Sequence, residues 1–101
     1  MDDQLTGVLL EELKSTLRIT WADEDTDLKK IIQRAEAYLQ ELCGASLDFS
    51  KESQPKTLLL ERCRYVYNNA ADEFEGNFQH ELSRLIFKVG IEQVVIEDGS
   101  V

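Results

Sequence analysis

The chain has 101 residues, and its 43% hydrophobic content is enough for one domain with one modest core. Asp and Glu number 20 against 11 Lys and Arg, a formal net charge of -9, which argues against a surface that holds DNA or anionic lipid through counterion release. No cationic segment leads into an apolar run at the start, and no apolar run approaches the roughly 20 residues that span a bilayer, so we expect a soluble intracellular product.

The first predicted helix begins at Gly7, after a short acidic segment, with Thr6 as its expected N-cap. Its apolar stripe consists of Leu10, Leu13 and Leu17. After this helix the spacing breaks at β-branched residues, and we expect Trp21 to pack onto the bundle as the anchor of a loop.

The second predicted helix has the strongest periodicity, because its apolar residues recur in steps of three and four for about four turns. They are Leu28, Ile31, Ile32, Ala35, Tyr38, Leu39 and Leu42. Asp23 or Asp25 can cap its N-terminus, and Gly44 is expected to end it in the left-handed conformation. Residues 45–54 are predicted to form a structured loop.

The third predicted helix, residues 55–74, is expected at the centre of the bundle. Pro55 suits its first turn, where a missing N–H has no intrahelical partner to lose. Two adjacent apolar stripes follow: Leu59, Cys63, Val66 and Ala70, and Leu60, Tyr67, Ala71 and Phe74. So wide an apolar arc needs partners on more than one side.

A fourth predicted helix follows a break at residues 75–77, where Asn77 can act as a cap, and it ends at Gly90. Its apolar residues are Phe78, Leu82, Leu85, Ile86 and Val89. The β-branched residues beyond Gly90 favour an extended conformation. We therefore predict an all-α fold, one domain over residues 1–101, with a bundle of about four helices in residues 7–89. Residues 90–101 are predicted to form an extended C-terminal tail that is mobile in the monomer and becomes ordered on assembly.

No calcium loop is predicted, although Asp23, Asp25 and Asp27 imitate the first three ligands of one. The position that requires glycine holds Leu28, and the position of the bidentate glutamate holds Arg34. We interpret the acidic cluster as a capping and solvated group.

Catalytic and zinc sites are equally unsupported. His80 is the one histidine, so neither a zinc protease nor a Ser–His pair can be built. Cys43 and Cys63 form no CxxC pair and are expected to be small buried apolar residues. We predict no enzyme activity, no cofactor and no metal.

Three motifs occur in a fixed order along residues 10–89. The first is L-x-x-L-K-x-x-L, formed by Leu10, Leu13, Lys14 and Leu17. The second is formed by Ile19, Asp23, Asp25, Leu28, Ala35, Tyr38 and Leu39, and the third, residues 64–85, contains Y-V-Y-N-N-A and E-F-E-x-N-F. Together they resemble the head-to-tail connector family of long-tailed bacteriophages, the small helical adaptor or head-completion proteins beneath the portal. The aliphatic tail departs from the L-L-x-x-x-R ending of many relatives.

The resemblance implies a structural protein that forms a ring on the portal after DNA packaging, extends the DNA channel and offers a docking surface. The implied partners are the portal protein, neighbouring copies in a cyclic ring, and a downstream stopper or tail-completion protein. DNA would pass an acidic lumen without sequence-specific binding, and no membrane is involved. The implied location is the head–tail interface of the virion, and the host cytoplasm during assembly.

We expect subunit or portal contacts from two places. The helical period turns Tyr65 away from the Leu59 stripe, and two adjacent amides, Asn68 and Asn69, are more than a core needs. Alternatively, Tyr65 lies at the edge of the bundle and the amides are merely solvated. The tail contributes Ile91, Val94, Val95 and Ile96.

Two other functions stay open from the residues alone: a generic helical interaction or regulatory module of a prophage, and a DNA-binding regulator. A DNA reader needs basic and amide side chains on its recognition helix. The fourth predicted helix offers Gln79, Arg84 and Lys88 against Glu81, which is a weak footprint.

Overall fold

The computed structural model describes residues 3–100, with side chains described as far as Glu92. This part of the chain contains five α-helices and no strand, which confirms the predicted all-α class. The helices are α1 (Asp3–Leu17), α2 (Asp25–Cys43), α3 (Gln54–Tyr67), α4 (Ala71–Asn77) and α5 (Gln79–Ser100).

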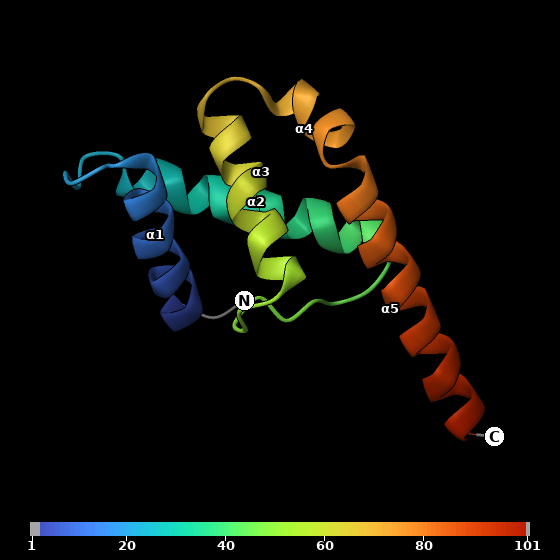
Figure 1. Cartoon of the computed structure of the whole chain (residues 1–101). Coiled ribbons are helices and arrows are strands. Elements are labelled where there is room, and N and C mark those ends of the chain that lie inside the picture. Colours follow the sequence, from blue (N-terminus) through green and yellow to red (C-terminus); the bar gives the residue numbers. More distant parts are fainter. Residues whose placement is uncertain (1–2, 101) are drawn as a thin grey trace.

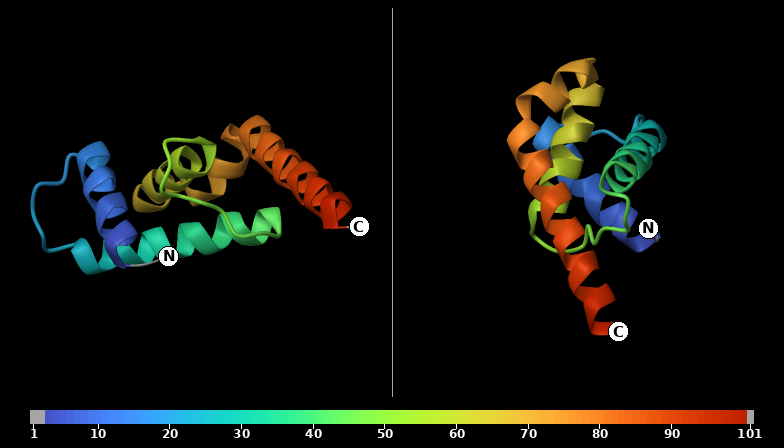
Figure 2. Two further views of the ribbon diagram at one scale, coloured as in Figure 1. Left: turned by 90° about the horizontal axis from the view of Figure 1, so that it is seen from below. Right: turned by 90° about the vertical axis from the view of Figure 1, so that its right-hand side faces the viewer.

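Helix α3 is the central element, since it contacts each of the other four helices. Helix α2 runs along one side of the molecule, and α1, α3 and α5 all lie on the same side of α2 (Figures 1 and 2). Helix α1 lies near one end of the long axis and α5 at the other, and α4 forms a corner between α3 and α5 (Figure 1). The prediction that the Pro55 helix is central is therefore confirmed.

One hydrophobic core joins all five helices. Its buried apolar residues are Leu9, Leu10, Leu13, Ile19, Leu28, Ile32, Ala35, Leu39, Phe49, Leu58, Leu59, Cys63, Phe74, Leu82, Leu85 and Val89. Most of them belong to the predicted stripes, and each large side chain buried completely contributes about 1.5–3 kcal/mol to stability. Loop residues Ile19 and Phe49 also belong to the core, which closes the bundle on two edges.

The ends of α2 follow the predictions in part. Gly44 has φ 66°, and its backbone N–H donates to the carbonyls of Gln40 and Glu41, as expected of a left-handed C-cap. The N-cap is Glu24 rather than Asp23 or Asp25, and no side chain caps the free N–H groups. Asp25 lies in the first turn and pairs with Lys14 of α1 at 2.8 Å. The Asp25 carboxylate therefore pairs with Lys14 and does not cap α2, although the local sequence had suggested that it could.

Helix α1 begins at Asp3, so the prediction of a start at Gly7 with Thr6 as the N-cap is wrong. Leu5 packs against the core one turn before Leu9, and this contact extends the helix backwards. Trp21 is also not the buried loop anchor that we expected. It is 48% exposed, and its indole N–H donates to Glu24 at 2.7 Å.

The predicted single helix over residues 55–74 is two helices. Helix α3 ends at Tyr67, and Asn69 has φ 58°, a left-handed conformation that asparagine tolerates better than most residues. The Ala70 N–H donates to the Tyr65 carbonyl at 2.8 Å, which closes the turn before α4 begins at Ala71. The Asn68–Asn69 pair is thus a stop signal that the wide apolar arc concealed.

Helix α5 passes through Gly90 and continues to Ser100, so the expected helix stop at Gly90 and the extended conformation of residues 90–100 are corrected. A glycine inside a helix costs only about 1 kcal/mol relative to alanine, and β-branched residues cost less than that. These costs do not outweigh continuation of a helix already anchored by Leu82, Leu85 and Val89. The side chains of Val94, Val95 and Ile96 lie outside the described residues. Mobility of this segment in the monomer stays a prediction.

Candidate functional site

The first candidate surface is the α3–α4 corner, which we define as Arg64, Tyr65, Asn68, Asn69 and Asn77. Tyr65 comes from the last turn of α3 and Asn77 from the last turn of α4. The Asn77 amide donates to the Tyr65 hydroxyl at 3.0 Å, and this bond ties the two helix ends together. The structure therefore places Tyr65 at the edge of the bundle, partly buried, and not fully outward.

An aromatic cluster beneath this corner holds it in place. The Tyr65 ring meets Phe74 and Phe78 edge to face at 5.6 Å each, and the latter two rings stack at 5.0 Å. Tyr38 of α2 meets Phe74 at 6.1 Å, and the Arg62 guanidinium lies 4.1 Å from the Tyr38 ring centroid. Such aromatic and cation–π contacts each add about 0.5–1.5 kcal/mol beyond area burial. Sequence reasoning missed the cluster, because its members come from three different predicted segments.

The two amides of the corner have different surroundings. Asn68 is exposed and donates from its side chain to the Arg64 carbonyl at 2.9 Å, which caps the end of α3. Asn69 is exposed as well, and its backbone adopts the left-handed conformation that turns the chain after α3. A shallow pocket of about 220 Å³ is lined by Arg64, Tyr65, Asn68, Ala70, Glu73 and Asn77. The pocket thus gathers Tyr65 and Asn68 but not Asn69, and it offers amide, hydroxyl and guanidinium groups to a polar partner.

The second candidate surface is the α5 face, which we define as Arg84, Phe87, Lys88 and Ile91. These residues are spaced i, i+3, i+4 and i+7, so they share one side of the helix while Leu82, Leu85 and Val89 face the core. Phe87 is 69% exposed and Ile91 48% exposed. Neighbouring Ile86, predicted to be part of the apolar stripe, is 38% exposed. Large apolar side chains grouped in this way on a surface are typical of interaction sites.

The α5 face borders a groove against the start of α3. Gln54, Arg84, Phe87 and Lys88 line a volume of about 500 Å³, and Lys51 lines the adjoining volume together with Lys88. The Gln54 amide donates to the Glu81 carbonyl at 3.0 Å, which holds α3 against α5 here. Within the side chains that the structure describes, no carboxylate pairs with Arg84 or Lys88. Sequence reasoning had named Ile91 but missed Phe87, whose only signal was its position off the apolar stripe.

The corner and the α5 face line different pockets, which share no residue. Among the described residues no group of three or more His, Cys, Asp or Glu side chains could hold a metal ion. In the same part of the chain no helix combines the length and the hydropathy that crossing a bilayer demands. The geometry offers contact surfaces, built from amides, cations and exposed apolar groups.

Comparison with known protein families gives a match over most of the chain. Residues 8–91 match the family described as "Phage gp6-like head-tail connector protein". The matched region includes the corner and the whole α5 face. No curated protein and no solved structure matches the chain.

Proposed function

The chain belongs to the phage gp6-like head-tail connector protein family, and from this premise we propose that it assembles as a cyclic ring on the portal after DNA packaging. There it extends the DNA channel and offers a docking surface to the next connector, stopper or tail-completion protein. Membership in this family makes the protein a structural one, with head and tail components as partners and the head–tail interface of the virion as its place.

The observation that carries the ring is the α5 face. It exposes Phe87 and Ile91 beside two cations that no described carboxylate neutralises. A soluble monomer gains nothing from that arrangement, whereas a neighbouring subunit would bury the apolar groups and pair the charges. Where this face meets a different surface of the next copy, the contact joins unlike patches. Such contacts produce rings when the rotation between copies closes.

The net charge of -9 supports passage of DNA through the ring. Duplex phosphates are repelled by carboxylates, so a lumen lined with them lets the packaged DNA slide without being held. Association with the portal then depends on the contact surfaces and not on DNA.

We assign contacts with the portal or a neighbour to Tyr65, Asn68 and Asn69. The pocket beside Tyr65 and Asn68 has hydrogen-bonding groups and is open to solvent. The second contact segment contains Ile91, Val94, Val95 and Ile96, of which Ile91 is the one with a described side chain. Removal of residues 91–101 should leave a folded monomer that no longer assembles, because Leu82, Leu85 and Val89 remain to hold α5. Unchanged ring formation would show that the segment is dispensable.

The decisive experiment is incubation of the protein with purified portal, followed by electron microscopy of the complexes. Rings seated on the portal are expected. Free subunits without any portal binding would reject the proposal. Duplex binding that weakens steeply with salt would instead favour a DNA-binding regulator.

A further inference from the structure

We infer that neighbouring copies join through one particular contact: the Trp21 loop of one copy docks on the α5 face of the next. The Trp21 loop is defined as residues 20–24 together with the first turn of α2, residues 25–27, with Trp21, Asp23, Glu24 and Asp27 as its main side chains. This inference rests on the proposed function, because it names the two surfaces that would meet between copies of a ring.

The Trp21 loop presents a fixed aromatic side chain to solvent. The indole is 48% exposed, and its N–H donates to the Glu24 carboxylate at 2.7 Å. The same carboxylate accepts from the Tyr67 hydroxyl at 3.1 Å, so Glu24 is itself anchored to the end of α3. A tryptophan held in this way loses little conformational freedom on binding, and tryptophan is among the residues most enriched at binding hot spots.

The loop also carries negative charge that is free to pair. Asp23 and Asp27 are exposed, and none of the ion pairs among the described residues involves them. Asp25 differs, since it is already bonded to Lys14. A partner surface for this loop therefore needs an apolar or cationic group that packs on the indole. It also needs cations beside that group to pair with the loop carboxylates.

The α5 face supplies those groups. Phe87 lies next to Lys88 and one turn from Arg84, in a groove of about 500 Å³ that opens against Gln54. An indole packed on Phe87 would lie within reach of the Arg84 guanidinium, and a cation over an aromatic face is worth about 0.5–2 kcal/mol. The loop carboxylates would then neutralise Arg84 and Lys88. Both the charge and the apolar character of the two surfaces are complementary.

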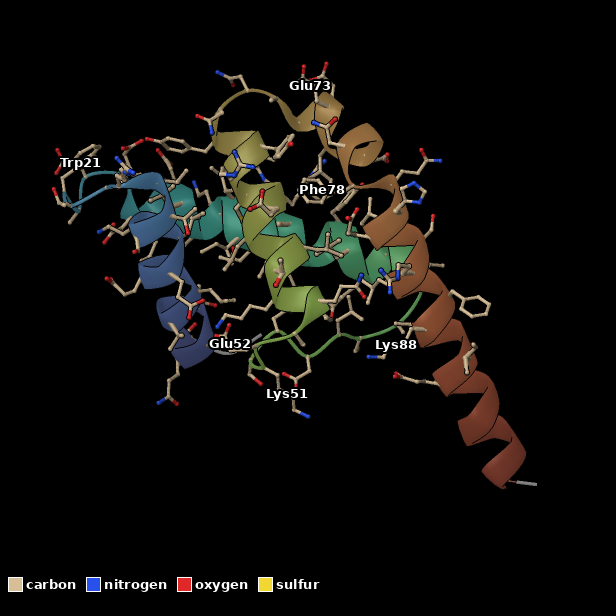
Figure 3. The ribbon with its side chains drawn as sticks, viewed as in Figure 1. Trp21, Lys51, Glu52, Glu73, Phe78 and Lys88 are labelled. Carbon is tan, nitrogen blue, oxygen red and sulfur yellow. The ribbon has the colours of Figure 1, made fainter. Side chains whose placement is uncertain are left out.

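The two surfaces cannot meet within one chain. Figure 3 shows Trp21 at one end of the molecule and Lys88 toward the other, and Figure 1 shows α5 lying at the end remote from the loop between α1 and α2. The chain extends 52 Å along its longest axis. A contact between opposite ends links copies head to tail, the arrangement that closes into a ring by rotation.

Cross-linking between copies tests this contact. In a Cys43→Ala background one population carries Asp23→Cys and another carries Lys88→Cys, and Cys63 is buried. A disulfide-linked dimer is expected only when the two populations are mixed. The matched control replaces Asp23→Cys with Asp72→Cys, an exposed position on α4, and should give no cross-link. Dimers from the Lys88→Cys population alone would overturn the inference in favour of α5 pairing with itself.

The cross-link is scored on free protein at high concentration and on purified portal. One outcome would overturn the inference and leave the proposed function intact. In it, the unsubstituted protein forms rings on the portal, but the mixed Asp23→Cys and Lys88→Cys proteins give no cross-link there. A cross-link in free protein with no portal binding would support the contact while rejecting the proposed function.

Charge exchange gives an independent measurement. Asp23→Lys with Asp27→Lys, or Arg84→Glu with Lys88→Glu, should weaken self-association roughly tenfold or more. The chain with all four substitutions should recover most of that loss. Lys29→Glu with Lys30→Glu, exposed in the first turns of α2, is the control and should not weaken association. Absence of recovery in a quadruple variant whose circular dichroism is native would refute the contact.

Discussion

The Lys56 ammonium lies 2.8 Å from the Glu12 carboxylate, and this ion pair joins α3 to α1 across 44 residues of sequence. Lys56 is only 5% exposed, and it also donates to Glu52, which lies just before α3 begins. Hydrogen bonds to the Glu12 and Glu52 carboxylates raise the pKa of the Lys56 ammonium, and they outweigh the opposite effect of desolvation. The pair therefore fixes the position of α1 on the bundle.

Replacement Glu12→Gln should lower the free energy of unfolding by about 1 kcal/mol, because Lys56 then depends on Glu52 alone. Urea unfolding followed by circular dichroism measures the change. Glu11→Gln, an exposed neighbour, is the control and should change stability by less than about 0.5 kcal/mol. Equal effects at the two positions would mean that the pair does not hold α1.

Stability should fall as the pH rises above about 9. Burial raises the pKa of the Cys63 thiol from 9.0 to about 12. In this range the unfolded chain has lost the thiol proton while the folded chain keeps it, so raising the pH favours unfolding by up to about 1.4 kcal/mol per pH unit. Cys63→Ala should be less stable at pH 7 but lose less stability between pH 9 and 11. Parallel stability curves for the two proteins would contradict the assignment.

Position 69 should tolerate replacement of Asn69 by glycine but not by a β-branched residue. Its φ of 58° is a left-handed conformation, which costs about 1–2 kcal/mol for a residue with an ordinary side chain. Asn69→Val should destabilise the protein by about that amount, whereas Asn69→Gly should stay within about 0.5 kcal/mol of the parent. Thermal unfolding of the two variants provides the comparison. Asn68→Val, at φ -92°, is the control, and it should cost less than Asn69→Val.

Substitution of Gly90 tests whether α5 passes through this residue or ends at it. Apart from its chain neighbours and the backbone of its own helix, no described heavy atom lies within 4 Å of a Cβ added there, and the residue is inside α5. Gly90→Ala should therefore stabilise the protein by up to about 1 kcal/mol and raise the helical circular dichroism signal. A C-terminal cap with positive φ would give the opposite sign, a loss of stability. Gly44→Ala, at such a cap with φ 66°, is the control that should destabilise.

Several features could be predicted from the sequence because they depend on local spacing. The stripes that include Leu13, Leu39 and Leu85 were enough to indicate an all-α bundle, and the covered environment of Leu59 and Cys63 followed from the wide apolar arc of the third predicted helix. Gly44 as a C-cap followed from its place after the last periodic residue. The order of motifs also indicated the connector family that residues 8–91 match.

Other features depended on contacts between segments distant in sequence. Periodicity could not reveal that Asp25 pairs with Lys14 in place of capping α2, or that Tyr65 packs on Phe78. It also could not show that Asn69 turns the chain, because asparagine is acceptable in helices, turns and solvent alike. The fate of such residues is decided by whichever tertiary partner satisfies their polar groups.

By itself, then, the sequence determined the helical class, the identity of most core residues and the family. Only the tertiary structure decided which side chains stayed outside: it exposed Trp21, for which burial was predicted, and it left Phe87 exposed beside Arg84 and Lys88. The physical reason is that burial of a stripe follows from its period, whereas exposure of an aromatic residue depends on whether the folded chain leaves any surface to cover it.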